Sequence, residues 1–157
     1  PLDQGIMVDR QYVRVDDETQ TPVDEATVGE NLQVRITIVA TQPLHYVNIE
    51  DPIPAGAEAV NPNLQTSQQI GTRPTYTRVD SQYGWGWWWF SNIEFRDEKV
   101  VLSASYLPVG VYEFVYTIRP VLPGEYNVIP TTAQEFYFPE IYGRGKGMTF
   151  TINAADE

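Results

Sequence analysis

The sequence predicts an all-β fold, an antiparallel sandwich of about seven to nine strands joined by Greek-key connections. Three observations support this prediction. Several segments alternate apolar and polar residues with a period of two, which is typical of half-buried strands. Clusters of Pro with Gly or Asn separate these segments and mark turns. No stretch of about ten residues has the 3.6-residue period of an amphipathic helix.

Four segments alternate most clearly, and each predicts a strand with one face in the core. The predicted core-facing sets are Leu32, Val34, Ile36, Ile38 and Ala40; Val100, Leu102, Ala104 and Tyr106; Tyr112, Phe114, Tyr116 and Ile118; and Met148, Phe150 and Ile152. Shorter strands are predicted over residues 12–15, 46–49, 76–79 and 125–128. A single helical turn is predicted over residues 131–136, with Thr131 or Thr132 as the N-cap.

Length and composition favour one domain that spans residues 1–157, with its core over residues 8–152 and a frayed end from residue 153. The 157 residues include no Cys, which removes disulfides, thiol catalysis and Cys-based metal sites. The net charge of −11 argues against binding to nucleic acid or to an anionic membrane surface. The chain does not begin with Met, so we expect it to be a segment of a longer protein.

One region does not fit a plain sandwich. Residues 61–80 are polar and Gln-rich, and residues 83–90 then carry six aromatic side chains. Strand alternation would place aromatic rings on both faces of this segment, so one face needs a cover from a loop, a domain or a partner. The predicted aromatic contact patch consists of Trp85, Trp87, Trp88 and Trp89. The alternative is a carbohydrate platform, because flat rings stack on sugar faces.

No motif in the sequence predicts catalysis, a cofactor or a bound metal. The single His, His45, stands at the start of a predicted strand, where a structural role is expected. Acidic pairs such as Glu50–Asp51 lie beside turn residues and are interpreted as solvated loops rather than as glycosidase carboxylates. The Gly-rich segment Gly143–Gly147 precedes a strand rather than a helix, so it is interpreted as a flexible hairpin connection rather than a phosphate site.

Three sequence blocks resemble the C-terminal domain of bacterial alpha-2-macroglobulins. The first runs from Asp51 to Glu58, with Asn61–Leu64 after it, and the second from Glu94 to Val100. The third, residues 122–144, resembles the closing pattern of that family, although position 134 is Gln where Glu is expected. The resemblance covers about residues 12–152 and implies an immunoglobulin-like, macroglobulin-like sandwich.

The resemblance implies a role inside a large protease-trapping inhibitor of the bacterial periplasm, envelope or extracellular space. Such a parent has a bait region that the protease cuts, and many members carry a thioester in a different domain. This chain has no Cys and cannot hold that bond. We therefore expect a non-enzymatic domain, monomeric when isolated, whose partners are the thioester domain and neighbouring macroglobulin domains of the same parent. Target proteases are expected to meet the domain only through the parent.

The family pattern also implies a specific contact residue. Tyr137 matches the Tyr of the closing pattern, and in bacterial members this Tyr is thought to cover the thioester. Phe136, Phe138 and Tyr142 are expected to flank it as packing residues. The alternative for Tyr137 is a core or loop-anchoring aromatic residue. The alternative for the whole chain is an immunoglobulin-like module of a bacterial adhesin that binds carbohydrate through its Trp cluster.

Overall fold

The computed structural model describes residues 2–60, 75–78 and 92–155, and these residues form three β-sheets. In the first sheet the strand order is β1 (Leu2–Gln4), β13 (Tyr142–Arg144), β12 (Thr132–Glu135), β5 (Leu44–Pro52), β9 (Lys99–Leu107) and β8 (Asn92–Phe95). In the second it is β2 (Ile6–Arg14), β4 (Leu32–Ala40), β10 (Gly110–Pro120) and β6 (Ala57–Ala59), with β7 (Thr75–Arg78) also paired to β10. A third sheet joins β11 (Gly124–Val128), β14 (Met148–Asn153) and β3 (Glu25–Thr27).

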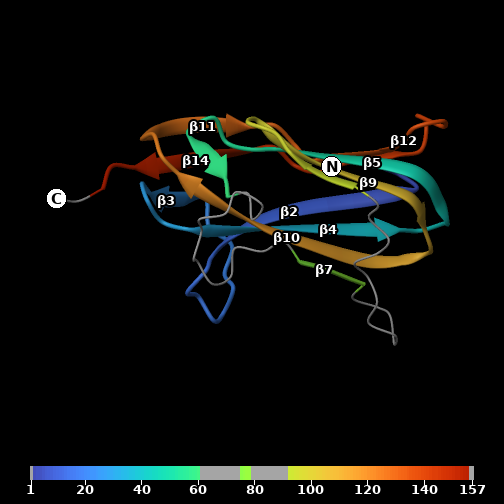
Figure 1. The fold of residues 1–157 in the computed structure, drawn as a ribbon, viewed down its shortest axis with the longest axis horizontal. Coiled ribbons are helices and arrows are strands. Elements are labelled where there is room, and N and C mark those ends of the chain that lie inside the picture. Colours follow the sequence, from blue (N-terminus) through green and yellow to red (C-terminus); the bar gives the residue numbers. More distant parts are fainter. Residues whose placement is uncertain (1, 61–74, 79–91, 156–157) are drawn as a thin grey trace.

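The first two sheets are the layers of a sandwich, and their inner faces share one apolar core (Figure 1). Ile36 and Phe114 contribute to it from one sheet, and Ile49 and Leu102 from the other. The chain passes from β4 to β5 in the opposite sheet and later returns as β10 beside β4; β12 likewise returns beside β5. These crossings are Greek-key connections, as predicted. Among the described strands only β3 and β14 pair in parallel.

The alternating segments form the strands that the sequence predicts. All five predicted core residues of β4 and all four of β10 are buried. The described residues nevertheless form 14 strands, more than the seven to nine predicted. The additional strands are short, since β1, β3, β6 and β13 have three residues each. A run of three residues is too short for alternation to be recognised in the sequence.

The helical turn predicted over residues 131–136 is wrong, because residues 132–135 form strand β12 between β5 and β13. Ala133 and Glu135 face inward, so this segment has the strand period. Thr131 is fully buried and its hydroxyl donates a hydrogen bond to Asp51 instead of capping a helix. Pairing with a strand on each side thus outweighs the weak local preference of this segment for a helical turn.

The flexible connection predicted over Gly143–Gly147 is also wrong in its first part, where strand β13 includes Gly143 and Arg144. Gly143 lies so close to β2 that a Cβ there would overlap the carbonyl group of Ile6. The glycine therefore serves close packing between the two sheets rather than flexibility.

Strand β5 changes phase at Tyr46. Leu44 and Val47 are both buried although they are three residues apart, and the two residues between them are exposed. The cause is the backbone of Tyr46, which has φ of +54° inside a strand. A left-handed residue interrupts the pleat, so the side chains beyond it point to the opposite face from the one that alternation predicts.

Strand β9 changes phase at the same level. Ala104 and Leu107 are buried, and the two residues between them are exposed. The β5–β9 ladder omits the pair that Tyr46 would make with Ser105. Tyr106, predicted to face the core, is 41% exposed for this reason.

Candidate functional site

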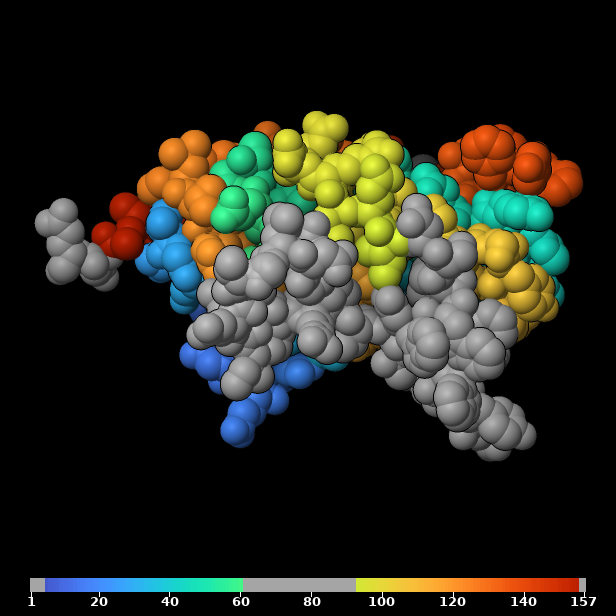
Figure 2. All heavy atoms as spheres, in the orientation of Figure 1, coloured from blue at the N-terminus to red at the C-terminus, as the bar shows by residue number. Residues whose placement is uncertain are grey.

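Three consecutive aromatic side chains are exposed in the segment that follows β12. The exposed fractions are 73% for Phe136, 64% for Tyr137 and 56% for Phe138. In Figure 2 the corresponding orange-red segment projects from one end of the molecule beside the teal end of β5. Large apolar side chains are usually buried, so three in a row at a projecting tip make this segment a candidate site.

A short turn closes this exposed segment at its base. The amide of Glu135 donates to the carbonyl oxygen of Ile141 (3.1 Å), and the amide of Ile141 donates to that of Phe138 (2.9 Å). The side-chain amide of Gln134 also donates to the carbonyl oxygen of Pro139 (3.3 Å). These bonds tie both ends of the segment together, and the aromatic side chains stand on the closed turn.

Two further hydrogen bonds attach the same segment to β5. The carboxylate of Glu135, which is 3% exposed, accepts from the backbone amide of His45 (Oε1···N 2.8 Å). The amide of Phe136 donates to the carbonyl oxygen of Tyr46 (2.8 Å). The left-handed backbone at Tyr46 thus lies where the base of the aromatic segment is hydrogen-bonded to β5.

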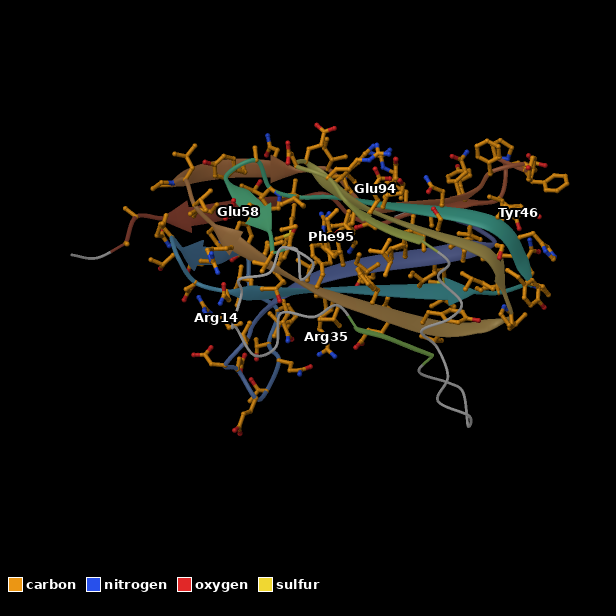
Figure 3. All side chains as sticks on the ribbon, viewed as in Figure 1. Arg14, Arg35, Tyr46, Glu58, Glu94 and Phe95 are labelled. Carbon is orange, nitrogen blue, oxygen red and sulfur yellow. The ribbon has the colours of Figure 1, made fainter. Side chains whose placement is uncertain are left out.

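The ring of Tyr137 lies nearly perpendicular to two neighbouring rings. It lies 5.1 Å from the ring of Tyr46 at an interplanar angle of 89°, and 5.2 Å from the ring of Phe136 at 87°. Edge-to-face pairs at these distances are attractive. We call Tyr46, Phe136, Tyr137 and Phe138 the aromatic ridge. Figure 3 shows Tyr46 at the end of the molecule where this ridge lies.

A groove runs beside the ridge. It has a volume of about 420 Å³ and is bounded by Tyr46, Phe136 and Tyr137 on one side and by residues 103–105 of β9 on the other. Ser103 donates to the side chain of Asn48 (3.2 Å), and Ser105 is exposed. Small side chains on the β9 side leave room for an inserted group next to the Tyr137 ring.

The other predicted contact residues lie elsewhere or outside the described residues. Tyr142 is half-buried on β13, where it pairs with Gln134, so it is not part of the ridge. Trp85, Trp87, Trp88 and Trp89 lie outside the described residues. The ring of His45 packs on Tyr106 (centroids 5.1 Å apart) rather than on the ridge.

Within the described ranges, no group of three or more His, Asp or Glu side chains is placed to hold a metal ion. No helix in those ranges is long and apolar enough to cross a membrane.

A buried polar network that the sequence did not predict lies at the other end of β5. Asp51 is 1% exposed, so its interpretation as part of a solvated acidic loop is wrong. Its carboxylate accepts from Arg10 on β2 (2.8 Å), from the hydroxyl of Thr131 (2.7 Å) and from the phenol of Tyr116 on β10. Arg10 also donates to the carbonyl oxygens of Pro52 (3.2 Å) and Ile129 (3.1 Å). The sequence does carry a signal for this burial, because Asp51 is in phase with the buried residues Val47 and Ile49 of β5.

This network connects both sheets, and its surroundings shift the pKa values of several of its members. Burial, and then the negative charge of Asp51, raise the pKa of the Tyr116 phenol well above its ordinary value. Burial likewise raises the pKa of Tyr12, whose ring lies under the Arg10 guanidinium (5.5 Å). Burial opposes the charge of Arg10, but the groups around it, Tyr12 and Asp51 foremost, raise its pKa overall.

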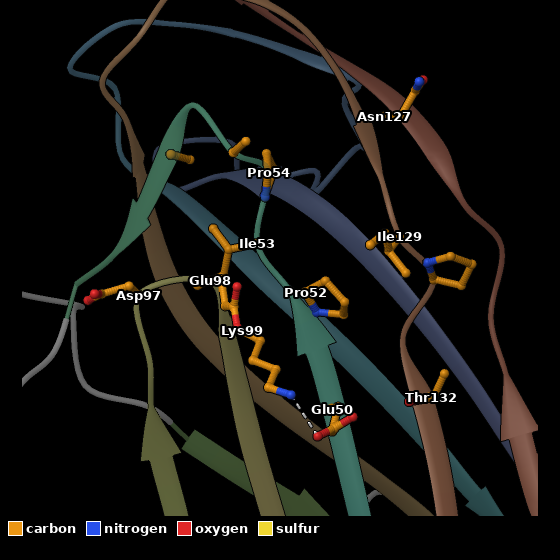
Figure 4. Close-up of a pocket in the computed structure, with 13 residues that line it drawn as sticks. Glu50, Pro52, Ile53, Pro54, Asp97, Glu98, Lys99, Asn127, Ile129 and Thr132 are labelled. Carbon is orange, nitrogen blue, oxygen red and sulfur yellow. Dashed lines mark hydrogen bonds and ion pairs between the residues drawn. The ribbon is translucent and has the colours of Figure 1, made fainter.

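The described parts of the three sequence blocks that resemble bacterial alpha-2-macroglobulins meet around one cleft (Figure 4), and Asn61–Leu64 lie outside the described residues. The cleft has a volume of about 630 Å³. It is lined by Glu50, Pro52, Ile53, Pro54, Ala55 and Ala57, by Asp97, Glu98 and Lys99, and by Asn127, Ile129, Pro130 and Thr132. In its lining, Lys99 of β9 bonds Glu50 of the neighbouring strand β5 (Nζ···Oε1 2.9 Å). The blocks are thus distant in sequence but adjacent in space.

Comparisons with known proteins agree with this architecture. An alpha-2-macroglobulin from Xylella fastidiosa is 28% identical over 149 residues, which are 92% of this chain and 9% of that protein. The structure of trypsin-activated alpha-2-macroglobulin from Escherichia coli has a TM-score of 0.78 at 19% identity and covers 98% of this chain and 11% of that one. Salmonella alpha-2-macroglobulin reacted with methylamine has a TM-score of 0.74 at 22% identity and covers 98% and 9%. At these identities the structures show a shared fold.

The chain therefore spans only a tenth or less of the length of the alpha-2-macroglobulins from Xylella and Nostoc that it resembles. The family model for the bacterial alpha-2-macroglobulin MG10 domain matches residues 5–140, most of the chain. With the predicted sandwich present as well, the chain belongs to the family of bacterial alpha-2-macroglobulin MG10 domains.

Proposed function

We propose that this chain is a non-catalytic, terminal domain of a protease-trapping inhibitor and that its aromatic ridge covers a thioester in a neighbouring domain of the same parent. The observation that carries the proposal is the exposure of Tyr137, which is 64% accessible although hydrogen bonds close the turn beneath it. An exposed aromatic ring on a firmly held turn has the form of an interdomain contact.

The chemistry of a thioester explains why an aromatic cover would be useful. Its acyl carbon is electrophilic, so water and small amines destroy it unless they are kept away. A phenol can exclude water with its ring and donate a hydrogen bond to the acyl oxygen with its hydroxyl. Tyr137 offers both groups, and the 420 Å³ groove beside it leaves space for the covered segment.

The same proposal assigns the parent to the bacterial periplasm, cell envelope or extracellular space, where it would meet proteases. The partners of this domain would be the thioester domain and the adjacent macroglobulin domains. We further propose that residues 1–157 fold alone as one monomeric domain, because the described core is continuous.

The test uses the intact parent and the variant Tyr137→Ala. Salmonella alpha-2-macroglobulin has been crystallised after reaction with methylamine, so the same small amine is a suitable probe. Tyr137→Ala should accelerate loss of the thioester in methylamine and leave the melting temperature of the domain nearly unchanged. A large loss of domain stability with unaltered amine sensitivity, or a parent that incorporates no methylamine, would reject the shielding role.

A further inference from the structure

We propose that Tyr46 is the positioning residue that holds the Tyr137 ring in its outward orientation. The inference rests on the proposed function for its consequence in the parent, but the positioning itself is a property of this domain. Tyr46 belongs to none of the three sequence blocks and was not predicted as a site residue.

The backbone of Tyr46 has a conformation that is unusual for its residue type. Residues other than Gly, Asn and Asp rarely adopt φ near +54°, the value at Tyr46, because their Cβ then comes too close to the carbonyl oxygen. The other described non-Gly residue with positive φ, Gln20, lies in a turn outside any strand. Tyr46 lies inside β5, so a ladder must accommodate the change. Such conformations persist where surrounding contacts fix them, and they gather at functional positions.

This backbone conformation determines where the carbonyl group and the side chain of Tyr46 point. It directs the Tyr46 carbonyl oxygen to the amide of Phe136 and brings the Tyr46 side chain to the exposed face, where it is 54% accessible. Alternation from the buried Leu44 would have turned this side chain into the core. The left-handed residue therefore places the aromatic ring of β5 on the same surface as Tyr137.

The ring of Tyr46 also contacts the ring of Tyr137. The rings of Tyr137 and Tyr46 have centroids 5.1 Å apart and an interplanar angle of 89°, next to the backbone hydrogen bond from Phe136 to Tyr46. Its other ring neighbour, Phe136, is on the same turn and is 73% exposed. Tyr46 thus supplies a ring from the sandwich itself, whereas the ring of Phe136 stands on the same turn as Tyr137.

Two variants separate the ring of Tyr46 from its backbone. Tyr46→Gly adopts positive φ freely, so it keeps the backbone bond to Phe136 and removes only the ring. Tyr46→Phe keeps a ring of the same shape. Tyr46→Asn, which also tolerates left-handed backbone, replaces the Gly variant if that one does not fold. Tyr106→Ala is the matched control, since it removes an exposed ring from the neighbouring strand that packs on His45.

The direct readout is fluorine NMR of the 157-residue chain with 3-fluorotyrosine at position 137. In Tyr46→Gly the resonance should narrow and move toward its position in the unfolded chain. In Tyr46→Phe and Tyr106→Ala it should stay where it is in the unmodified sequence. An unchanged resonance in Tyr46→Gly would overturn the positioning role.

The second readout is the methylamine reaction of the intact parent. Tyr46→Gly should accelerate it about two- to tenfold, the range expected from losing one aromatic pair, and Tyr46→Phe should restore the original rate. If Tyr137→Ala accelerates the reaction and Tyr46→Gly does not, the inferred consequence of Tyr46 for the parent is wrong and the shielding function stands. If neither does while the fluorine resonance moves, the shielding function is wrong and Tyr46 still positions Tyr137.

Discussion

Arg10 on β2 and Asp51 on β5 form an ion pair between the two sheets, with 2.8 Å between the guanidinium nitrogen and the carboxylate oxygen. Their side chains are 3% and 1% exposed. Burying two charges is costly, and it is tolerated where further hydrogen bonds satisfy them. Here Thr131 and Tyr116 also donate hydrogen bonds to Asp51, so the four residues form one buried polar network.

Asp51→Asn should destabilise the domain by about 3 to 5 kcal/mol, because it leaves Arg10 buried and without its counter-charge. The matched control is Glu50→Gln on the same strand, since Glu50 pairs with Lys99 at a partly exposed site. That change should cost about 1 kcal/mol or less. Urea denaturation of the two variants measures both values. Equal losses would show that the buried pair has no special weight.

The pKa of Tyr116 is raised in the folded state, which predicts the direction of the alkaline pH dependence. Unfolded tyrosine ionises near pH 10, so above about that pH the unfolded chain releases a proton that folded Tyr116 retains. The stability contribution is therefore complete below that pH and is lost as the pH rises further. Tyr116→Phe should lower stability at neutral pH by about 1.5 to 3 kcal/mol, the range for a hydrogen bond to a charged group.

The same variant should flatten the alkaline decline, because Phe has no proton to release. Tyr12 contributes to the remaining decline, since its pKa is raised as well. Thermal denaturation of both proteins from neutral to alkaline pH tests this. Parallel curves for the two proteins would contradict the assignment to Tyr116.

Gly143→Ala should destabilise the domain by about 1 to 3 kcal/mol, because the added Cβ would overlap the carbonyl group of Ile6 on the facing strand. Gly147→Ala is the control, because the nearest atom to its Cβ would be 3.3 Å away and the loss should be smaller. Chemical denaturation compares the two. A Gly143→Ala variant as stable as the original would mean that β13 can move away from β2.

The long strands could be predicted from the sequence because their alternation is set by burial of one face. Phe114 and Ile36 are examples, since each lies within several buried residues of the same phase. Tyr106 could not be predicted, because its phase depends on a left-handed residue on the neighbouring strand. One residue with unusual φ reverses every orientation that simple alternation assigns beyond it.

The candidate site was predictable only in part. Tyr137 could be selected through the family pattern, and its surface position then came from the turn that Glu135 and Ile141 close. Tyr46 lies 91 positions earlier in the chain (137 − 46) and carries no motif, so its contact with Tyr137 arises from the pairing of β5 with β12. Asp51 looked like a loop residue because Pro52 and Pro54 follow it, although β5 continues to Pro52.

We expect the parent to cover the aromatic ridge in its native form, because the proposed function makes this ridge a contact surface. Hydroxyl-radical footprinting of residues 136–138 measures this directly, in the 157-residue chain and in the intact parent before and after protease cleavage. We predict rapid oxidation in the 157-residue chain, where the three side chains are 56% to 73% exposed, strong protection in the native parent and renewed oxidation after cleavage. Equal oxidation in the 157-residue chain and in the native parent would show that the parent does not cover the aromatic ridge.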